Sequence, residues 1–213
     1  MPLFFRAEAK REFIRLPTDD LRGKTVGIVG LGGNGRKISQ VLQPWGVRSI
    51  ATDFYPVEPP PEVESLLPAD RLDELLSQSD IVILTLPLND STKGLIDDER
   101  IARMRQGSYL INVARGAVVK EDALVAALES KHLAGAGLDV TEVEPLSPES
   151  KLWDDPRVMI SPHVGAQSAR RIDDTTELAC FNLQRYLSGE KPMNLVDKSL
   201  GFPHPSVVWK SGC

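Results

Sequence analysis

Short apolar runs alternate along the chain with segments in which apolar residues recur every three or four positions. Runs of strand length bounded by turn residues indicate buried β-strands, and the three-to-four spacing indicates helices. The expected strands are residues 25–30, 48–53, 81–86, 109–113, 137–140 and 158–161. The expected helices are residues 36–42, 72–76, 100–104, 121–128 and a long last helix that Gly189 closes. This alternation predicts an α/β fold, a doubly wound parallel sheet with helices on both faces.

The last helix and two further segments carry separate expectations. Apolar residues on the last helix follow steps of three and four, which predicts one buried stripe. The stripe consists of Ala169, Ile172, Thr176 (through its methyl group), Ala179, Leu183 and Leu187. The proline-rich residues 55–61 are expected to form a loop, and residues 201–213 an irregular tail.

Composition places the chain among ordinary globular proteins. Its 213 residues are 41% hydrophobic and 26% charged, enough for one large core. The net charge of −5 offers no basic face, so neither nucleic acid nor a membrane is an expected partner. The apolar N-terminal run is broken by charge after Phe5, unlike a signal peptide. Two cysteines, Cys180 and Cys213, are too few for a disulfide framework, so a cytoplasmic location is expected.

A glycine-rich turn is the first candidate for chemistry. Gly30, Gly32 and Gly35 fit the pattern G-x-G-x-x-G directly after a strand and at the start of a helix. The first glycine permits a tight turn, the second lets the backbone approach a pyrophosphate, and the third lets the helix pack on the sheet. The helix N-terminus, with Gly33 and Asn34, then offers N–H groups to the phosphates. An isolated motif of this kind also occurs in ordinary strand-to-helix turns, but here its context favours nucleotide binding.

Asp53 supports the same interpretation. It ends the next strand, 18 residues after Gly35. A carboxylate at this point accepts hydrogen bonds from the hydroxyls of the adenosine ribose and repels a 2′-phosphate. The expected cofactor is therefore NAD rather than NADP.

Three ionisable residues, Arg115, Glu144 and His163, are the candidate catalytic groups. An acid–base pair, a fixed cation and a dinucleotide cradle in one chain point to hydride transfer to or from a 2-oxo or 2-hydroxy acid. The remaining histidines, His132 and His204, have no such context and are expected to be structural. No metal site is expected, because no cysteine pair has ligand spacing and the histidines are scattered.

Several independent phrases carry a resemblance to a known family: LRGKTVGIVGLGGNG, ILTLPLNDSTKGLI, GSYLINVARGAVV, EDALVAAL, AGAGLDVTEVEP and SPHVGAQS. The chain resembles the NAD-binding domain of the D-isomer-specific 2-hydroxyacid dehydrogenases. The resemblance implies a single Rossmann-type cofactor domain at residues 23–197, an N-terminal arm at 1–22 and a tail at 198–213. The arm is too short for the family's N-terminal substrate domain. Asn34 is a departure, since the family usually has an aliphatic residue there.

The resemblance also implies a role for each site residue. His163 would be the general acid and base, and Glu144 would hold its imidazole and favour the protonated ring. Arg115 would polarise the substrate carbonyl and grip its carboxylate with the planar guanidinium. Backbone passing along the cofactor is implied at Leu86, Pro87, Val113 and Ala114, and contacts near the nicotinamide at Asp139, His163 and Gly165. A homodimer is the expected assembly.

Other interpretations remain open at this point. A lone histidine is usually a surface or core residue, Arg115 could be a surface cation, and acidic loops such as that of Glu144 are ordinarily just solvated. A non-catalytic NAD-sensing module of the co-repressor type is the main functional alternative to a dehydrogenase. Formate dehydrogenase is disfavoured, because it typically has glutamine in place of Glu144. Glyoxylate, hydroxypyruvate, 3-phosphoglycerate and D-lactate are all open as substrates.

Overall fold

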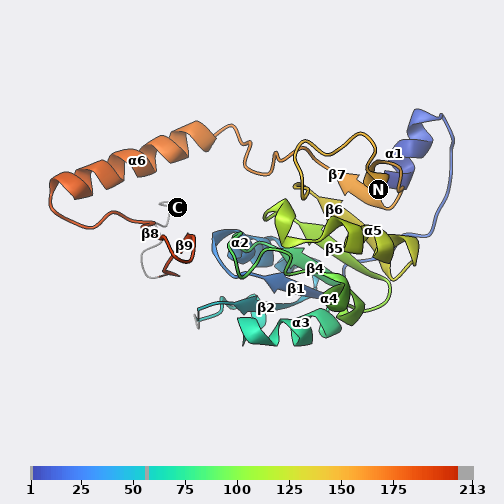
Figure 1. Ribbon diagram of the computed structural model, residues 1–213, viewed down its shortest axis with the longest axis horizontal. Helices are drawn as coiled ribbons and strands as arrows, with labels where there is room; N and C mark the ends of the chain where they lie inside the picture. Colours follow the sequence, from blue (N-terminus) through green and yellow to red (C-terminus); the bar gives the residue numbers. More distant parts are fainter. Residues whose placement is uncertain (1, 56–57, 206–213) are drawn as a thin grey trace. The chain divides into compact units, whose positions relative to one another are not determined.

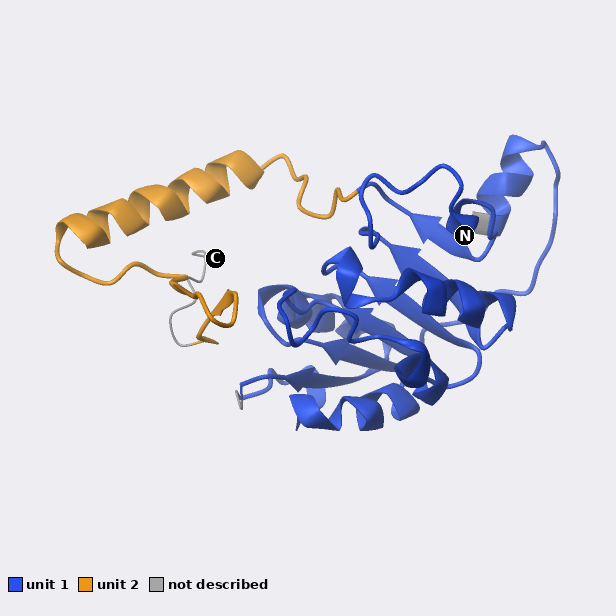
Figure 2. Cartoon of the chain, viewed as in Figure 1, with its two compact units in different colours: residues 1–162 blue, residues 163–213 orange. Residues whose placement is uncertain are grey.

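The protein divides into two compact units, residues 1–162 and 163–213 (Figure 2). The structure, a computed structural model, describes residues 2–55 and 58–205. The boundaries that the sequence suggested, after residues 22 and 197, stay predictions.

A parallel sheet forms the centre of the first unit (Figure 1). Its seven strands are β1 Thr25–Val29, β2 Arg48–Asp53, β3 Val63–Pro68, β4 Ile81–Leu84, β5 Ser108–Asn112, β6 Leu133–Leu138 and β7 Val158–Ile160. Their order in the sheet is β3-β2-β1-β4-β5-β6-β7, and every neighbouring pair is parallel. The expected doubly wound parallel sheet is confirmed.

Helices cover both faces of this sheet because successive strand residues point to opposite sides. In β4, Val82 and Leu84 belong to one buried cluster, while Ile83 belongs to the other. The first cluster packs under α3 Leu72–Gln78, α4 Asp98–Arg103 and α5 Glu121–Glu129. The second packs under α2 Gly33–Leu42 through Ile38 and Leu42.

The sequence pattern located six of the seven strands and missed β3. Only Val63 is buried in β3, and the strand lies at the edge of the sheet. A half-exposed edge strand has no continuous apolar run to reveal it. β6 begins at Leu133, earlier than predicted. The sequence pattern missed this beginning because Gly135 and Gly137 interrupt the apolar run.

Shorter elements connect the main ones. They are η1 Gln43–Trp45, η2 Ala69–Arg71, η3 Gly116–Val118, η4 Lys151–Trp153 and the N-terminal helix α1 Pro2–Ala9. The Arg6 guanidinium of α1 donates hydrogen bonds of 2.7–3.1 Å to the carbonyl oxygens of Trp153, Asp154 and Asp155. These bonds satisfy backbone groups at the end of η4 and hold α1 against the rest of the first unit.

The predicted buried stripe on the last helix is wrong. The second unit contains α6 Arg171–Leu187, β8 Val196–Asp197 and β9 Phe202–Pro203. None of the α6 residues is buried, and Ile172 and Leu187 are 78% and 75% exposed. Amphipathic spacing indicates which residues share a helix face, but it does not establish that the face is buried. Among the described residues of this unit, only the two-residue strands β8 and β9 accompany the helix.

Two further expectations concern this unit. Gly189 closes α6 as predicted, in a left-handed conformation with φ of 75°. Residues 201–213 are not wholly irregular, because β9 pairs with β8. Cys180 is exposed on α6, and Cys213 lies outside the described residues. Every described helix is too short or too polar to cross a membrane.

We expect Gly35→Ala to destabilise the first unit by about 1–3 kcal/mol, the usual cost of overpacking. A Cβ at Gly35 would lie 2.2 Å from the carbonyl oxygen of Gly30, which is backbone and cannot move cheaply. Urea unfolding without ligand measures the effect. Gly33→Ala is the matched control, since its Cβ would meet nothing within 4 Å among the described residues. Equal stability of the two variants would contradict the packing argument.

Asp155 makes stability depend on pH. Hydrogen bonds from Arg157 hold the pKa of the Asp155 carboxyl below its ordinary value of 3.8. The charged form is therefore favoured in the folded state, and its contribution is present at neutral pH and lost as pH falls through the lowered pKa. We expect Asp155→Asn to cost about 1 kcal/mol at pH 7.

The difference between wild type and Asp155→Asn should shrink as unfolding is measured at successively lower pH. Asp154→Asn is the matched control, because Asp154 is exposed and Arg6 and Lys151 hydrogen-bond to its backbone rather than to its carboxylate. A constant Asp155→Asn deficit between pH 7 and pH 3 would rule out the ion pair as its cause.

Candidate functional site

The glycine-rich turn lies where the chain reverses its direction of winding. From β1 the sheet grows through β2 and β3 on one side and through β4 on the other. The carboxyl ends of β1 and β4 therefore diverge into a crevice, the usual ligand site of open α/β sheets. The turn is held there by hydrogen bonds from Gly30 N–H to Thr52 O at 2.9 Å and from Thr85 Oγ1 to Gly30 O at 2.5 Å.

The N-terminus of α2 is open toward an anion. Its N-cap is Gly32, which gives no side-chain cap hydrogen bond. A Cβ placed on Gly32 or Gly33 would meet nothing within 4 Å in the described part of the chain, and Asn34 is exposed. Free space in front of uncapped helix N–H groups fits a phosphate group. The residues present thus fit the pyrophosphate of a dinucleotide.

Asp53 ties the turn to the end of β2. Its Oδ2 accepts a hydrogen bond from Leu31 N–H at 2.5 Å, and its Oδ1 accepts one from Tyr55 N–H at 3.1 Å. A carboxylate has about four acceptor positions, so two remain for ribose hydroxyls. The structure places this side chain beside the glycine turn, where the sequence expected it.

The backbone segments predicted to pass along the cofactor follow the neighbouring strands. Leu86 and Pro87 come just after β4, and the Leu86 Cα lies 3.0 Å from where a Gly30 Cβ would be. Val113 and Ala114 follow β5 directly, with Ala114 buried. All four residues are therefore at the carboxyl edge of the sheet.

Arg115 is exposed on a turn whose backbone is firmly held. Its Nη1 donates to Ala114 O at 2.7 Å. The next residue, Gly116, packs so closely on the loop after β6 that a Cβ there would lie 1.7 Å from Thr141 O. This contact joins the turn that carries Arg115 to the loop that carries Glu144.

The acidic residues of that loop have separate partners. Asp139 Oδ1 accepts from Ser161 Oγ at 2.6 Å, and its side chain is largely buried. Glu142 Oε2 accepts from the N–H of Glu121, the first residue of α5, at 2.8 Å. Glu144 Oε1 accepts from Thr141 N–H at 3.1 Å. The loop is thus organised by its carboxylates rather than merely solvated.

His163 and Gly165 belong to the second unit, of which His163 is the first residue. His163 is exposed and has φ of 53°, a left-handed conformation that is uncommon for residues other than glycine. Such strained backbone often occurs at functional sites. The structure therefore describes the histidine in its own unit and the arginine and glutamate in theirs.

The first unit gathers the other predicted site residues at one edge, because each follows a strand at its carboxyl end. Sequence reasoning missed several residues that hold this edge: Thr85, Asn112, Glu142 and Ser161. All four lie in the segments that carry the family resemblance. Only the hydrogen bonds identify their role.

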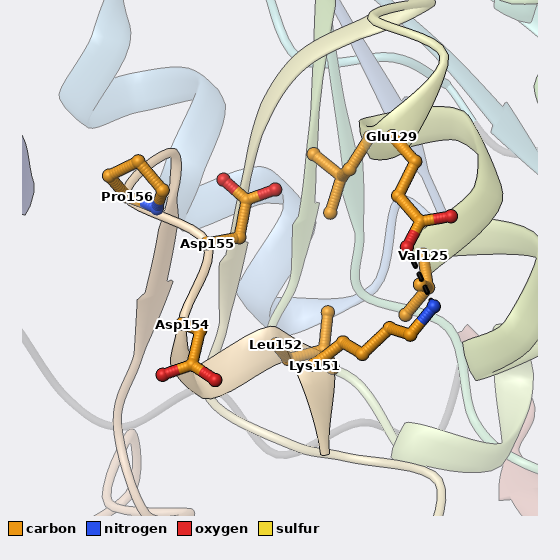
Figure 3. A pocket seen from close by; sticks show the side chains of 8 residues that line it. Val125, Glu129, Lys151, Leu152, Asp154, Asp155 and Pro156 are labelled. Atoms are coloured by element: carbon orange, nitrogen blue, oxygen red, sulfur yellow. Dashed lines mark hydrogen bonds and ion pairs between the residues drawn. The ribbon is translucent and has the colours of Figure 1, made fainter.

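A separate hollow of about 290 Å³ lies between α5 and the segment that leads into β7 (Figure 3). Val125, Leu128 and Asp155 line it, and Lys151 Nζ forms an ion pair of 2.8 Å with Glu129 Oε1 at its side. It borders the amino end of β7, whereas the candidate site lies at carboxyl ends. We therefore assign it no part in the site.

Known proteins similar to this chain agree with the geometry. Glyoxylate reductase from Thermofilum pendens is 40% identical over 184 residues, covering 85% of this chain and 53% of the relative. Hydroxypyruvate reductase from Blautia hydrogenotrophica is 37% identical over 185 residues, covering 85% and 56%. The chain thus spans about half the length of the curated relatives it matches.

Solved structures give the same result. A D-isomer-specific 2-hydroxyacid dehydrogenase from Xanthobacter autotrophicus Py2, in complex with NADPH and MES, superimposes with a TM-score of 0.84 at 35% identity, covering 94% of this chain and 82% of that one. An NADPH-dependent glyoxylate/hydroxypyruvate reductase from Sinorhizobium meliloti, in complex with NADP and sulfate, gives 0.84 at 30% identity, covering 94% and 64%.

Residues 5–165 match the NAD-binding domain of D-isomer-specific 2-hydroxyacid dehydrogenases. This match covers the parallel sheet, the glycine turn, Asp53, Arg115 and Glu144. The chain belongs to the D-isomer-specific 2-hydroxyacid dehydrogenase family.

Proposed function

We propose that this chain is the cofactor-binding part of an NAD-dependent dehydrogenase that interconverts small 2-oxo and 2-hydroxy acids such as glyoxylate, hydroxypyruvate or phosphoglycerate. The hydrogen bond between Leu31 N–H and Asp53 Oδ2 is the observation that carries it. That bond holds the Asp53 carboxylate beside the glycine turn, at the point where the sheet reverses its winding, which supports assigning them to the ribose and the phosphates. The names of the relatives, glyoxylate and hydroxypyruvate reductases, support this substrate class.

Each group of site residues has a part in this proposal. The glycine turn with Asn34 binds the pyrophosphate, Asp53 the ribose, and Asp139 and Gly165 flank the nicotinamide. Backbone along the cofactor comes from Leu86, Pro87, Val113 and Ala114. When bound, the cofactor supplies or accepts the hydride.

The three candidate catalytic residues handle the substrate. Arg115 binds its carboxylate bidentately and polarises its carbonyl. His163 gives a proton to the carbonyl oxygen in reduction and removes it from the hydroxyl in oxidation. Glu144 orients the imidazole. The exposed Arg115 side chain on a fixed turn suits such a role, since the backbone of the turn need not rearrange.

Location and assembly remain predictions. A homodimer and a cytoplasmic location follow from the family resemblance and the cysteine content.

We predict that NADH binds more tightly than NADPH by tenfold or more, about 1.4 kcal/mol. The Asp53 carboxylate would repel a 2′-phosphate, and Phe54 and Tyr55, the residues that follow it, supply no cation. Calorimetric titration with both cofactors measures the two affinities. The outcome discriminates between the cofactors because two similar solved structures hold NADPH or NADP.

Asp53→Asn should reduce the ratio of NADH to NADPH affinity by raising the affinity for NADPH, because it removes the charge that repels the 2′-phosphate. Asp90→Asn, an exposed acid on a loop of the same unit, should leave the ratio unchanged. Equal affinities in wild type, or a preference for NADPH, would refute the assignment of Asp53.

We further predict that the purified 213-residue chain binds NADH but oxidises it with glyoxylate or hydroxypyruvate only at trace rates. In the relatives, the half that this chain does not span would supply the second wall of a substrate cleft and the closure that excludes water. Without an oriented carbonyl, several kcal/mol of barrier lowering are lost.

Steady-state and stopped-flow assays at saturating NADH should give a rate at least about a hundredfold below that of full-length Thermofilum pendens glyoxylate reductase measured in parallel, since each tenfold is about 1.4 kcal/mol. Comparable turnover would show that the first unit and residues 163–213 suffice. Absence of NADH binding would overturn the proposed function itself.

A further inference from the structure

The side chain of Asn112 forms hydrogen bonds with the turn that follows it. This residue is the last of β5 and is 1% exposed. Its Oδ1 accepts a hydrogen bond from Ala114 N–H at 3.0 Å, and its Nδ2 donates one to Arg115 O at 3.1 Å. The buried amide is thus satisfied at both ends by the backbone that leads into and through Arg115.

The main chain of the same turn is fixed to the strands on either side. Asn112 O accepts from Asp139 N–H at 3.0 Å, which connects the turn to the end of β6. Val113 N–H donates to Leu84 O at 3.3 Å, which connects it to the end of β4. β4, β5 and β6 are neighbours in the sheet, so one turn joins three strand ends (Figure 1).

The chemistry of the position demands an amide. Ala114 is buried, so its N–H must find an acceptor within the protein, and a buried donor left unpaired is costly. The Arg115 carbonyl needs a donor at the same time. Asparagine supplies both groups, aspartate supplies only the acceptor, and alanine supplies neither.

We propose that Asn112 is a positioning residue, which sets the backbone of residues 113–115 for the nicotinamide half of the cofactor and places Arg115 for the substrate. This inference rests on the proposed function, because it concerns one half of the proposed NAD site. The adenosine half, built from the glycine turn and Asp53, is held by other bonds. Asn112 should therefore affect the two halves unequally.

Comparing the binding of two ligands to the 213-residue chain tests this unequal effect. NADH engages both halves of the site, whereas ADP-ribose has the adenosine and pyrophosphate without the nicotinamide. We expect Asn112→Ala to weaken NADH binding at least tenfold by calorimetry and to change ADP-ribose binding by less than twofold. Asn112→Asp, which keeps the acceptor for Ala114 N–H, should restore part of the NADH affinity.

Asn182→Ala is the matched control. Asn182 makes the same two-way amide bridge, with Nδ2 donating to Met193 O at 3.1 Å and Oδ1 accepting from Met193 N–H at 2.7 Å, but it lies on α6. Its replacement should leave both affinities unchanged. Equal loss of NADH and ADP-ribose binding in Asn112→Ala, or no loss of either, would overturn the positioning role.

Hydrogen exchange of the wild-type chain provides a second arm that needs no variant to fold. Without ligand, the Ala114 amide should exchange as slowly as the amides within β5. Exchange as fast as that of exposed loops would overturn the proposal. A wild-type chain with a slow Ala114 amide but without NADH binding would instead contradict the proposed function while confirming that Asn112 holds the turn.

Discussion

Close backbone packing at the carboxyl edge of the sheet is the constraint on which the site depends. Gly35 brings α2 onto the carbonyl of Gly30, and Gly116 brings the turn after β5 onto the carbonyl of Thr141. At both positions a single methyl group would collide with backbone. Because these contacts are made by main chain, they place helix N–H groups and loop carboxylates without relying on flexible side chains.

Electrostatics at this edge are organised in the same way. Three carboxylates within a short loop would repel one another, yet each accepts a hydrogen bond at a different place: Asp139 from a serine, Glu142 from the N-terminus of α5, and Glu144 from the loop itself. Charge-assisted bonds of this kind are stronger than neutral ones and offset the repulsion. The loop that bears Glu144 consequently has a defined conformation before any ligand arrives.

The sequence could predict the elements whose burial is continuous and could not predict what depends on partners. Apolar runs located β1, β2, β4 and β5, because parallel strands are buried on both faces. β3 escaped as a half-exposed edge strand, and the stripe on α6 was assigned a burial that spacing alone cannot establish. Glycine spacing and Asp53 indicated the cradle. Asn112 lies in the segment GSYLINVARGAVV, but only its two side-chain hydrogen bonds distinguish it from an ordinary strand residue.

The helices of the first unit differ in what satisfies the N–H groups of their first turn. α4 is capped by Asp97, whose carboxylate accepts from Arg100 N–H, and α5 receives the Glu142 carboxylate from another loop. α2 has only Gly32 at its N-cap, without a side-chain cap. A serine or aspartate in place of Gly32 would stabilise the helix by only a few tenths of a kcal/mol, and its side-chain oxygen would occupy the N–H groups that face open space. A dianionic pyrophosphate satisfies those groups and the positive end of the helix dipole together. α3 also lacks a side-chain cap, at Arg71, so an absent cap does not by itself mark a binding site. What distinguishes α2 is the open space at its start, where a Cβ on Gly32 or Gly33 would meet no described atom within 4 Å, and this space is what fits the phosphates of the proposed cofactor.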